Sequence, residues 1–280
     1  MIIPTVFKNN FPDYLSESLD IVGTALKHSV KPVVCCSFGK DSMLVLYLVR
    51  LYYPEVTVLF SNSRHEYPDT YVFKNKFVKE HQLNLVEVPG KHTFWWIVER
   101  HGFPLKSKGN PYRYSRDYLP AHYCCLYLKK RPLSQYLRRE KYDFIFDGMR
   151  KEESLLRRYQ LNRRGVIRWH AGNHGTRVSP LANLTEQQVY QAHVDLNIPI
   201  CSLYDKKIEG LKVRSGCWCC TLALKKPKIK FLRLFYPRLW SQIMNRGLAK
   251  LIIEKKLNVV PTNSDVSDYI KYRPCFFDSL

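Results

Sequence analysis

Short apolar runs separated by amphipathic stretches occupy the first half of the chain. Each run is brief and almost wholly apolar, which is typical of strands buried on both faces of a parallel sheet. Strands that alternate with helices form βαβ units, so the pattern predicts an α/β fold with helices on both faces of a mostly parallel sheet. The expected strands are residues 31–37, 55–60, 83–88 and 143–147.

Helices are expected between these strands, where apolar residues recur at helical spacing. Pro68 stands at the start of one helix, a position that proline tolerates, whereas Pro132 is expected to interrupt another near its beginning. The expected helices are residues 13–29, 39–53, 68–81, 93–101 and 123–140.

The second half of the chain follows a different pattern. Residues 163–177 are basic and contain three glycines, which predicts either a hairpin or a mobile loop. A helix is expected at 185–196, because Thr185 and Gln188 occupy the positions of a capping box. Residues 198–216 are expected to form a loop.

The domain organisation follows from these elements. Residues 227–256 are expected to be helical with a basic surface, and no internal repeat or low-complexity linker divides the chain. We therefore expect one catalytic domain at residues 1–222 and a basic helical C-terminal extension at 223–280.

The charge balance points to anionic partners. The chain has 45 Lys and Arg against 24 Asp and Glu, a net charge of +21. Such an excess repels itself in a compact fold unless an anion screens it, so nucleic acid is the natural partner. Small anionic nucleotides, or a basic charge that serves solubility alone, are the alternatives.

The cysteine content bears on the compartment. Nine cysteines are many for a chain whose N-terminal residues lack an apolar run suited to a signal peptide. No window approaches the roughly 18 apolar residues of a membrane span. We expect a cytoplasmic protein with no membrane partner, where clustered cysteines more often bind metal or take part in catalysis than form disulfides.

A phosphate-binding loop is expected at residues 37–42, where the sequence SFGKDS links the first strand to the next helix. Small residues let backbone N–H groups converge on an anion, Lys40 adds a positive charge, and Asp41 can hold Mg²⁺ or cap the helix. The spacing is not that of a Walker A loop, and a simple capped turn is the alternative. The residues expected to bind the nucleotide here are Ser37, Phe38, Gly39, Lys40, Asp41 and Ser42.

Two close pairs of cysteines form the second chemical signal. Cys124 adjoins Cys125, and Cys217 precedes Cys220 in a C-x-x-C segment. Four thiolates in two pairs suit a tetrahedral metal or an iron–sulfur cluster. Cys219 is a further candidate ligand, although the C-x-x-C spacing favours Cys217 and Cys220. Of the remaining cysteines, we expect Cys35 and Cys36 in the core, and the roles of Cys201 and Cys275 stay open.

The loop sequence resembles the SGGKDS loop of the N-type ATP pyrophosphatases, with Phe38 in place of the first glycine. More specifically, the chain is similar to the phosphoadenosine phosphosulfate reductase family over residues 30–222. The resemblance implies a five-stranded, Rossmann-like adenine nucleotide alpha-hydrolase fold that uses ATP to adenylate a substrate and releases pyrophosphate. Besides the loop, the segments that carry it are residues 61–73, 123–133, 147–158 and 179–205.

The resemblance also implies roles for single residues. Phe60 and Ser61 would line the adenosine pocket, and Gly148 and Arg150 would meet the nucleotide, although Arg150 could instead be a solvated cation. The implied catalytic residues are Lys40, Asp41 and Arg150, with ATP and Mg²⁺. The cysteines look like the 4Fe–4S ligand set of the adenylyl-sulfate reductases and the DNA-phosphorothioation ATP pyrophosphatases. The implied cluster ligands are Cys124, Cys125, Cys217 and Cys220.

Two features separate the chain from the sulfonucleotide reductases. Their E-C-G-[IL]-H tail motif is absent, since Cys275 lies in KYRPCFFDSL. Residues 206–250 contain twelve Lys and Arg and one acidic residue, interleaved with aromatic residues that either stack on bases or face the core. These aromatic residues are Trp218, Phe231, Phe235, Tyr236 and Trp240.

Three hypotheses for the function follow. In the first, the chain adenylates DNA or tRNA for sulfur incorporation, with a cysteine desulfurase as the sulfur donor. In the second, it is an assimilatory adenylyl-sulfate or phosphoadenylyl-sulfate reductase that uses thioredoxin, with Cys275 as nucleophile. In the third, it is a non-catalytic nucleic-acid-binding module that keeps the nucleotide pocket as a sensor. A homodimer is compatible with all three.

Overall fold

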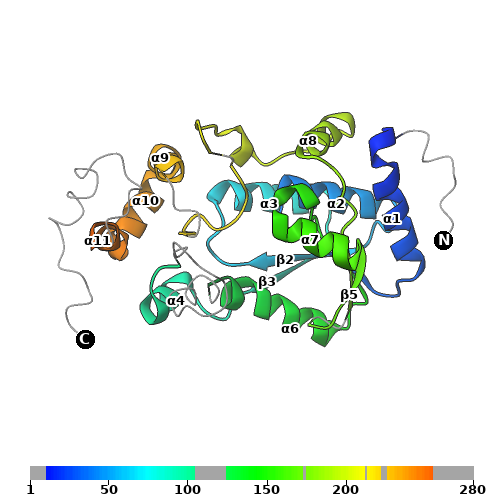
Figure 1. Ribbon diagram of the computed structural model, residues 1–280, viewed down its shortest axis with the longest axis horizontal. Helices are drawn as coiled ribbons and strands as arrows, with labels where there is room; N and C mark the ends of the chain where they lie inside the picture. The colour runs from blue at the N-terminus through cyan, green and yellow to red at the C-terminus, as the bar shows by residue number, and fades with distance from the viewer. Residues whose placement is uncertain (1–10, 105–123, 173–174, 212, 222–225, 255–280) are drawn as a thin grey trace.

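A six-stranded sheet forms the centre of the computed structural model, which describes residues 11–104, 124–172, 175–211, 213–221 and 226–254 (Figure 1). The strand order is β3-β2-β1-β4-β6-β5, and every neighbouring pair is parallel except the last, β6 and β5. The predicted α/β fold with a mostly parallel sheet is therefore confirmed. The strands are β1 (Pro32–Cys35), β2 (Thr57–Asn62), β3 (Leu85–Pro89), β4 (Phe144–Phe146), β5 (Ile167–His170) and β6 (Gly175–Val178).

The basic segment at 163–177 forms a hairpin whose strands extend the sheet. β5 and β6 pair antiparallel, with Trp169 opposite Thr176, and β6 then pairs parallel with β4. Of the two alternatives for this segment, the hairpin is therefore the correct one. The sheet has six strands instead of the five that the family resemblance implied, because β5 adds an edge strand beyond β6.

The strand order places a crevice at the middle of the sheet. The chain builds outward from β1 to β2 and β3 on one side, and then crosses to β4 on the other side. Such a reversal opens a crevice at the carboxyl ends of the two central strands, and ligands bind there in open α/β sheets. The ends of β1 and β4 therefore mark the expected position of the site.

Most helices lie where the apolar spacing predicted them. The helices found at their expected positions are α1 (Ser16–Lys27), α2 (Lys40–Arg50), α3 (Pro68–Glu80), α4 (Phe94–His101) and α8 (Glu186–Asp195). The capping box of α8 is confirmed, because Thr185 Oγ1 accepts from the Gln188 N–H (3.1 Å) and Gln188 Oε1 accepts from the Thr185 N–H (2.8 Å). Short 3-10 turns lie at Asp13–Leu15, Lys151–Glu153 and Ser202–Asp205.

The middle helices differ in detail from the expectation. Pro132 is the second residue of α6 (Arg131–Glu140), and the regular α-helical bonding of residues 124–140 is interrupted directly before it. A π-helical turn, η4 (Leu126–Lys130), precedes it. Helix α7 (Leu155–Arg164) was not expected at all, because Leu161 is its one buried residue and no apolar stripe marks it in the sequence.

Helices cover both faces of the sheet through two cores. Alternate residues of β1 point to opposite sides: Val34 belongs to the larger core with α1, α2 and α8, whereas Val33 belongs to a smaller core with Leu137 of α6. Fully burying one such side chain contributes about 1.5–3 kcal/mol. These two layers hold the crevice between β1 and β4 in place.

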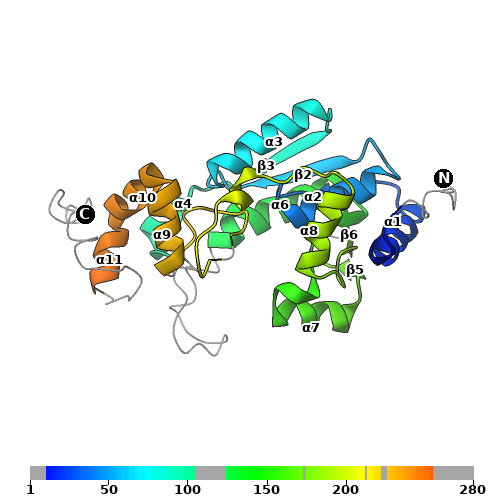
Figure 2. The ribbon, with the colours of Figure 1, turned by 90° about the horizontal axis from the view of Figure 1, so that it is seen from above.

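A second assembly of helices packs beside the sheet. Residues 226–254 form α9 (Lys226–Phe235), α10 (Pro237–Ile243), a π-helical turn η7 (Met244–Leu248) and α11 (Ala249–Glu254). They share a separate apolar core with α4 and η4, and Figure 2 shows them at the end of the molecule away from α1. The proposed boundary after residue 222 lies outside the described residues and stays a prediction.

The aromatic residues expected at 206–250 face this second core. Trp218, Phe231, Tyr236 and Trp240 are each no more than 7% exposed, and Phe235 is partly buried against them. Their packing explains the aromatic content of the segment, so the alternative that they face the core holds. Among the described helices, none has the length and apolar character needed to cross a membrane.

Candidate functional site

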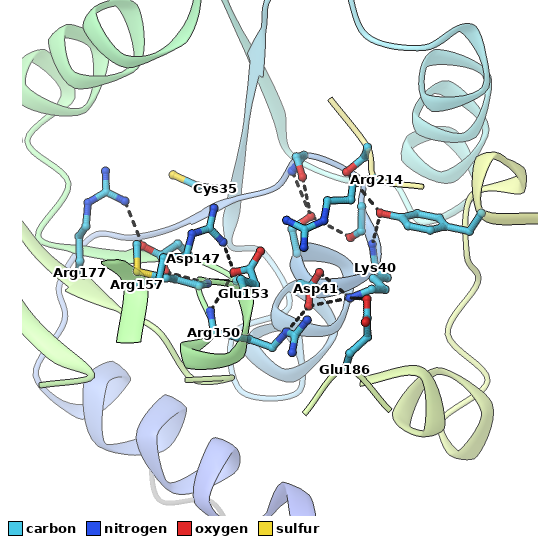
Figure 3. A pocket seen from close by; sticks show the side chains of 17 residues that line it. Cys35, Lys40, Asp41, Asp147, Arg150, Glu153, Arg157, Arg177, Glu186 and Arg214 are labelled. Carbon is cyan, nitrogen blue, oxygen red and sulfur yellow. Dashed lines mark hydrogen bonds and ion pairs between the residues drawn. The ribbon is translucent and has the colours of Figure 1, made fainter. Parts of the chain in front are cut away.

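A cavity of about 440 Å³ opens at the crevice between β1 and β4. The end of β1 leads into the start of α2, the end of β4 leads into residues 147–153, and residues 204–215 approach from the side of the second core (Figure 3). Of the sequence-predicted residues, the structure brings seven together in its lining. They are Ser37, Gly39, Lys40, Asp41, Ser42, Gly148 and Arg150.

The loop between β1 and α2 is held by its own serines. The Ser37 N–H donates to Ser42 Oγ (3.1 Å), and the Ser42 hydroxyl donates to the Gly39 carbonyl (3.0 Å). A Cβ on Gly39 would lie 2.2 Å from Ser215 Oγ, so any larger residue would require Ser215 to move. A Cβ on Gly148 would lie 3.0 Å from the Asp41 carbonyl carbon, so glycine also lets the end of β4 pack on the loop.

Phe38 replaces a glycine at a backbone position that favours glycine. Its φ is +56°, in the left-handed region that costs most residues about 1 kcal/mol or more. The ring is fully buried and meets Phe60 edge-on at 5.6 Å, which offsets that cost. Phe38 therefore supports the loop from below and lies outside the cavity lining.

Asp41 lies between the two buried cations of the site (Figure 3). Lys40 Nζ is 2.8 Å from one Asp41 oxygen, and Arg150 Nε is 2.5 Å from the other. Lys40 also approaches Glu186 (3.6 Å), and Arg150 reaches Glu152 (2.9 Å). Both cations are 5% exposed or less, so the site contains buried positive charge that neighbouring carboxylates neutralise.

This pairing sets the protonation states. Burial lowers the pKa of Lys40, and the adjacent Asp41 carboxylate opposes the shift without cancelling it. Burial acts to raise the pKa of Asp41, yet the charges and hydrogen bonds of Lys40 and Arg150 together lower it. Asp41 is therefore ionised at neutral pH and available as an oxygen ligand.

Further charged side chains surround this trio. Arg177 donates to Asp147 (3.1 Å), Arg157 pairs with Glu153, and Arg214 completes the cationic lining. Cations of this number suit a polyphosphate. In the described part of the chain no three His, Cys, Asp or Glu side chains converge on a metal-binding point. The Asp41 carboxylate in the lining suits Mg²⁺, which usually binds through one or two carboxylates plus substrate phosphates.

Phe60 and Ser61, expected in the adenosine pocket, do not line this cavity. Phe60 is 1% exposed and packs between Phe38 and Tyr71. The Ser61 hydroxyl is buried and has no hydrogen-bond partner among the described residues. Their proposed contact with a nucleotide stays a prediction.

Sequence reasoning missed several residues of the lining. Tyr204 Oη accepts from the Lys40 N–H (3.3 Å) and donates to Ser215 Oγ (3.4 Å), so a loop from beyond α8 covers the phosphate loop. No local spacing marks this contact, although Tyr204 lies within residues 179–205, one of the segments that carry the family resemblance. Cys35 was expected wholly in the core, but it also lines the cavity. The other missed lining residues are Glu153, Arg157, Arg177 and Glu186.

The paired cysteines lie in the second core. Cys217 forms a β-bridge with Glu66, and its Sγ is 3.2 Å from Ser63 Oγ. Burial, followed by the charges of Cys125, Cys217 and Cys220, raises the pKa of Cys124. The cysteines therefore share one neighbourhood.

Lys129 and Glu66 provide the polar contacts of this neighbourhood. Lys129 Nζ lies 2.7 Å from Glu66 Oε1, which also accepts from Ser63 Oγ (2.8 Å). Burial raises the pKa of Cys217 to about 11, although the Lys129 charge opposes the shift. Since soft thiolates suit an iron–sulfur cluster, the donor chemistry fits one, but the side chains do not form a closed ligand group as they stand. Cys219 and Cys201 are buried in the same core, and Cys275 lies outside the described residues.

Comparison with known proteins places these features in a family. Residues 31–223 match the model of the phosphoadenosine phosphosulfate reductase domain. Uncharacterized protein MJ0973 of Methanocaldococcus jannaschii is 32% identical over 218 residues, which cover 75% of this chain and 46% of that protein. The chain therefore spans less than half the length of that relative.

Two further proteins extend the likeness. Adenosine 5'-phosphosulfate reductase of Bacillus cereus is 27% identical over 213 residues, which cover 75% of this chain and 82% of the relative. The crystal structure of phosphoadenylyl-sulfate reductase from Candida auris, in a phosphate complex, superposes with a TM-score of 0.53 at 17% identity. It covers 78% of this chain and 97% of that chain. At this identity the structural likeness shows the fold alone.

Proposed function

Because the chain belongs to the phosphoadenosine phosphosulfate reductase domain family, we propose that it binds ATP in the cavity and adenylates a nucleic acid for sulfur incorporation. The observation that carries this proposal is Asp41, held between Lys40 and Arg150 at the start of α2. ATP phosphates attract both cations, and the released carboxylate takes Mg²⁺. The net charge of +21 supports a nucleic acid as the second substrate.

The proposed first step is adenylyl transfer. An oxygen of the nucleic acid attacks the α-phosphorus of ATP, the bond from that phosphorus to the bridging oxygen breaks, and pyrophosphate leaves with the electron pair. Lys40 and Arg150 stabilise the charge that grows on the phosphate oxygens. A single donor of this kind contributes about 10²–10³ in rate.

The proposed second step exchanges AMP for sulfur. The terminal sulfur of a donor persulfide, such as that of a cysteine desulfurase, attacks the atom of the nucleic acid that bears the adenylated oxygen. The bond from that atom to the oxygen breaks, and AMP leaves with the oxygen. A second thiol then cleaves the S–S bond and forms a disulfide with the donor cysteine. A 4Fe–4S cluster on Cys124, Cys125, Cys217 and Cys220 would supply Lewis-acid chemistry for sulfur. A cytoplasmic setting would keep these thiols reduced.

Pyrophosphate release tests the proposal. Protein purified without oxygen is incubated with ATP and Mg²⁺, and with DNA, tRNA or neither. Release that depends on one nucleic acid, and that is lost in Lys40→Ala, supports adenylation and identifies the substrate. Binding of nucleic acid without any release would favour the sensor hypothesis instead.

The second candidate is a sulfonucleotide reductase, favoured by the likeness to the Bacillus cereus reductase over 82% of its length. That protein's name describes reduction of adenosine 5'-phosphosulfate. The discriminating assay measures sulfite from adenylyl sulfate and phosphoadenylyl sulfate with reduced thioredoxin. Sulfite from the wild type and its loss in Cys275→Ser would establish this candidate, whereas no sulfite from the wild type would reject it.

A further inference from the structure

A basic segment with exposed aromatic and apolar side chains lies at the β5 edge of the sheet. We define the α7–β5 surface as the exposed side chains of residues 155–170, which cover α7, a two-residue connection and β5. These residues include five arginines and no Asp or Glu. Arg168 of β5 is buried, so the exposed positive charge of the surface is concentrated on α7, at Arg158, Arg163 and Arg164.

The exposed side chains of α7 form one face. Leu155 is 80% exposed and Tyr159 57% exposed, while Leu161 points to the opposite side and is buried. Arg163 follows Tyr159 by one helical turn, donates to its hydroxyl (2.7 Å) and lies 5.9 Å from its ring centre. This contact fixes an aromatic ring beside a cation on a solvent-facing helix.

β5 continues the surface with a second large ring. Trp169 is 64% exposed, and Ile167, two residues earlier on the same face of the strand, is 36% exposed. Burial lowers the pKa of His170, and the charges of Arg177, Arg168 and Arg164 add to this effect. Arg164, the last residue of α7, is separated from β5 only by Gly165 and Val166.

The cations of this surface are not neutralised within the described part of the chain. No Asp or Glu described there pairs with Arg158, Arg163 or Arg164. Arg157 and Arg168 differ, since they pair with Glu153 and Asp147 at the cavity. The surface thus begins at the wall of the cavity and extends from it as unpaired positive charge.

We propose that the α7–β5 surface binds a single-stranded stretch of nucleic acid. Arg158, Arg163 and Arg164 contact the phosphates, and Tyr159 and Trp169 stack on unpaired bases. Stacking needs an exposed ring face, which Tyr159 and Trp169 offer and the buried aromatic residues of the second core do not. That the bound nucleic acid is also the substrate rests on the proposed function, but the binding of nucleic acid to this surface does not.

Arg157 connects this surface to the chemistry. It belongs to α7 and also lines the cavity with Arg150 and Asp41. A strand lying along α7 therefore reaches the position where the α-phosphate of ATP would be attacked. Bases paired in a duplex are stacked on each other, so their faces are closed to Tyr159 and Trp169.

Fluorescence anisotropy without ATP tests the surface directly. The probe is a labelled single-stranded oligothymidylate, compared with a duplex of the same length. We expect Trp169→Ala to raise its Kd about tenfold and Trp169→Phe to restore most of the affinity, because base stacking on one ring contributes at this level. Tyr53→Ala is the matched control, because Tyr53 is 41% exposed at the end of α2.

Salt dependence separates the arginines from the rings. Each of Arg163→Ala and Arg164→Ala should reduce the slope of log Kd against log salt by about 0.7, as for loss of one phosphate contact on a single strand. Lys76→Ala on α3 removes a cation that is 72% exposed elsewhere and should leave affinity and slope unchanged. Unchanged slopes in both arginine variants would overturn the phosphate contacts.

Each remaining outcome decides the proposal. It fails if Trp169→Ala binds the probe like the wild type, or if sedimentation shows a dimer that this variant abolishes, because a second copy would then cover the surface. If the wild type releases no pyrophosphate with any nucleic acid but Trp169→Ala weakens binding, the proposed function fails and the surface stands. If the wild type releases pyrophosphate but Trp169→Ala binds the probe with normal affinity, the α7–β5 surface is rejected and the proposed function stands.

Discussion

The nucleotide cavity and the paired cysteines differ in how each holds its reactive groups. In the cavity, Lys40 and Arg150 are buried yet charged, because Asp41 lies between them. Around the cysteines, burial raises the pKa of Cys217 to about 11, so that thiol stays protonated at neutral pH. The cavity is prepared for a charged ligand as it stands, whereas the proposed cluster would have to replace the protons of the cysteine thiols in order to bind.

One segment joins the two regions. Tyr204 and Ser215 contact the phosphate loop, and Cys217 follows Ser215 by two residues. The regions are thus neighbours in the chain as well as in the fold. The proposed function assigns activation to the first and sulfur handling to the second, so variants should separate the two activities.

The largest expected effect is on activation. Lys40→Ala should lower pyrophosphate release about 10²–10³-fold, because it removes a cation aimed at the phosphates. The measurement is the initial rate of pyrophosphate release with the nucleic acid that stimulates the wild type. Lys31→Ala, which removes a half-exposed lysine from the start of β1, is the control and should leave the rate unchanged. Equal rates in Lys40→Ala and the wild type would remove the cavity from the reaction.

Cysteine variants should give the reverse result. Cys217→Ser should lower sulfur incorporation about 10–100-fold and reduce bound iron, while pyrophosphate release stays near the wild-type rate. Iron content and nucleoside mass spectrometry provide the measurement. Cys219→Ser, at a neighbouring buried thiol, should retain iron. Retention in Cys217→Ser and loss in Cys219→Ser would mean that Cys219 is the ligand in that segment.

Tyr204 tests the contact between the regions. Its hydroxyl occupies the Lys40 N–H that a phosphate would use, so Tyr204→Phe should tighten ATP binding about fivefold, the value of one net hydrogen bond. Calorimetric titration with ATP measures this change. Tyr190→Phe, whose ring lies 5.3 Å from Lys40 Nζ, is the control. Weaker binding by Tyr204→Phe would show that the hydroxyl contacts ATP itself.

The smallest expected effect is on stability at high pH. The pKa of Cys217 rises from 9.0 to about 11 on folding, so the folded metal-free protein holds a proton that the unfolded chain releases. Its contribution is fully present below about pH 9 and is lost as the pH rises through 11. Urea unfolding of metal-free protein should show this decline, and Cys217→Ser should reduce it. An equal decline in that variant would assign the effect to other groups.

The sheet and the phosphate loop could be predicted because their signals are local. Strands such as β1 are short apolar runs buried on both faces, and the loop residues from Ser37 to Ser42 are adjacent in the chain. The cysteine pairs were visible for the same reason. In each case a few consecutive residues carry both the structure and the chemistry.

Other features depend on contacts between distant segments. Tyr204 lies 164 residues after Lys40, and no local spacing announces that its hydroxyl covers the loop. Helix α7 lacked an apolar stripe, because a helix that exposes Leu155 and Tyr159 buries little. Trp240 and the other aromatic residues of 206–250 suggested base stacking, but they pack in the second apolar core. Which side of a helix is buried is decided by the partner it packs against.

Cleavage of ATP at the α-phosphate in response to a nucleic acid is the property that most distinguishes the proposed function from a reductase or a sensor. Anaerobic protein with ATP labelled in the α-phosphate provides the most direct measurement, since adenylyl transfer moves that label. We expect pyrophosphate and a labelled, adenylated nucleic acid from the wild type, and neither product from Lys40→Ala. Wild-type protein that releases sulfite from adenylyl sulfate but no pyrophosphate from ATP would contradict the proposed function.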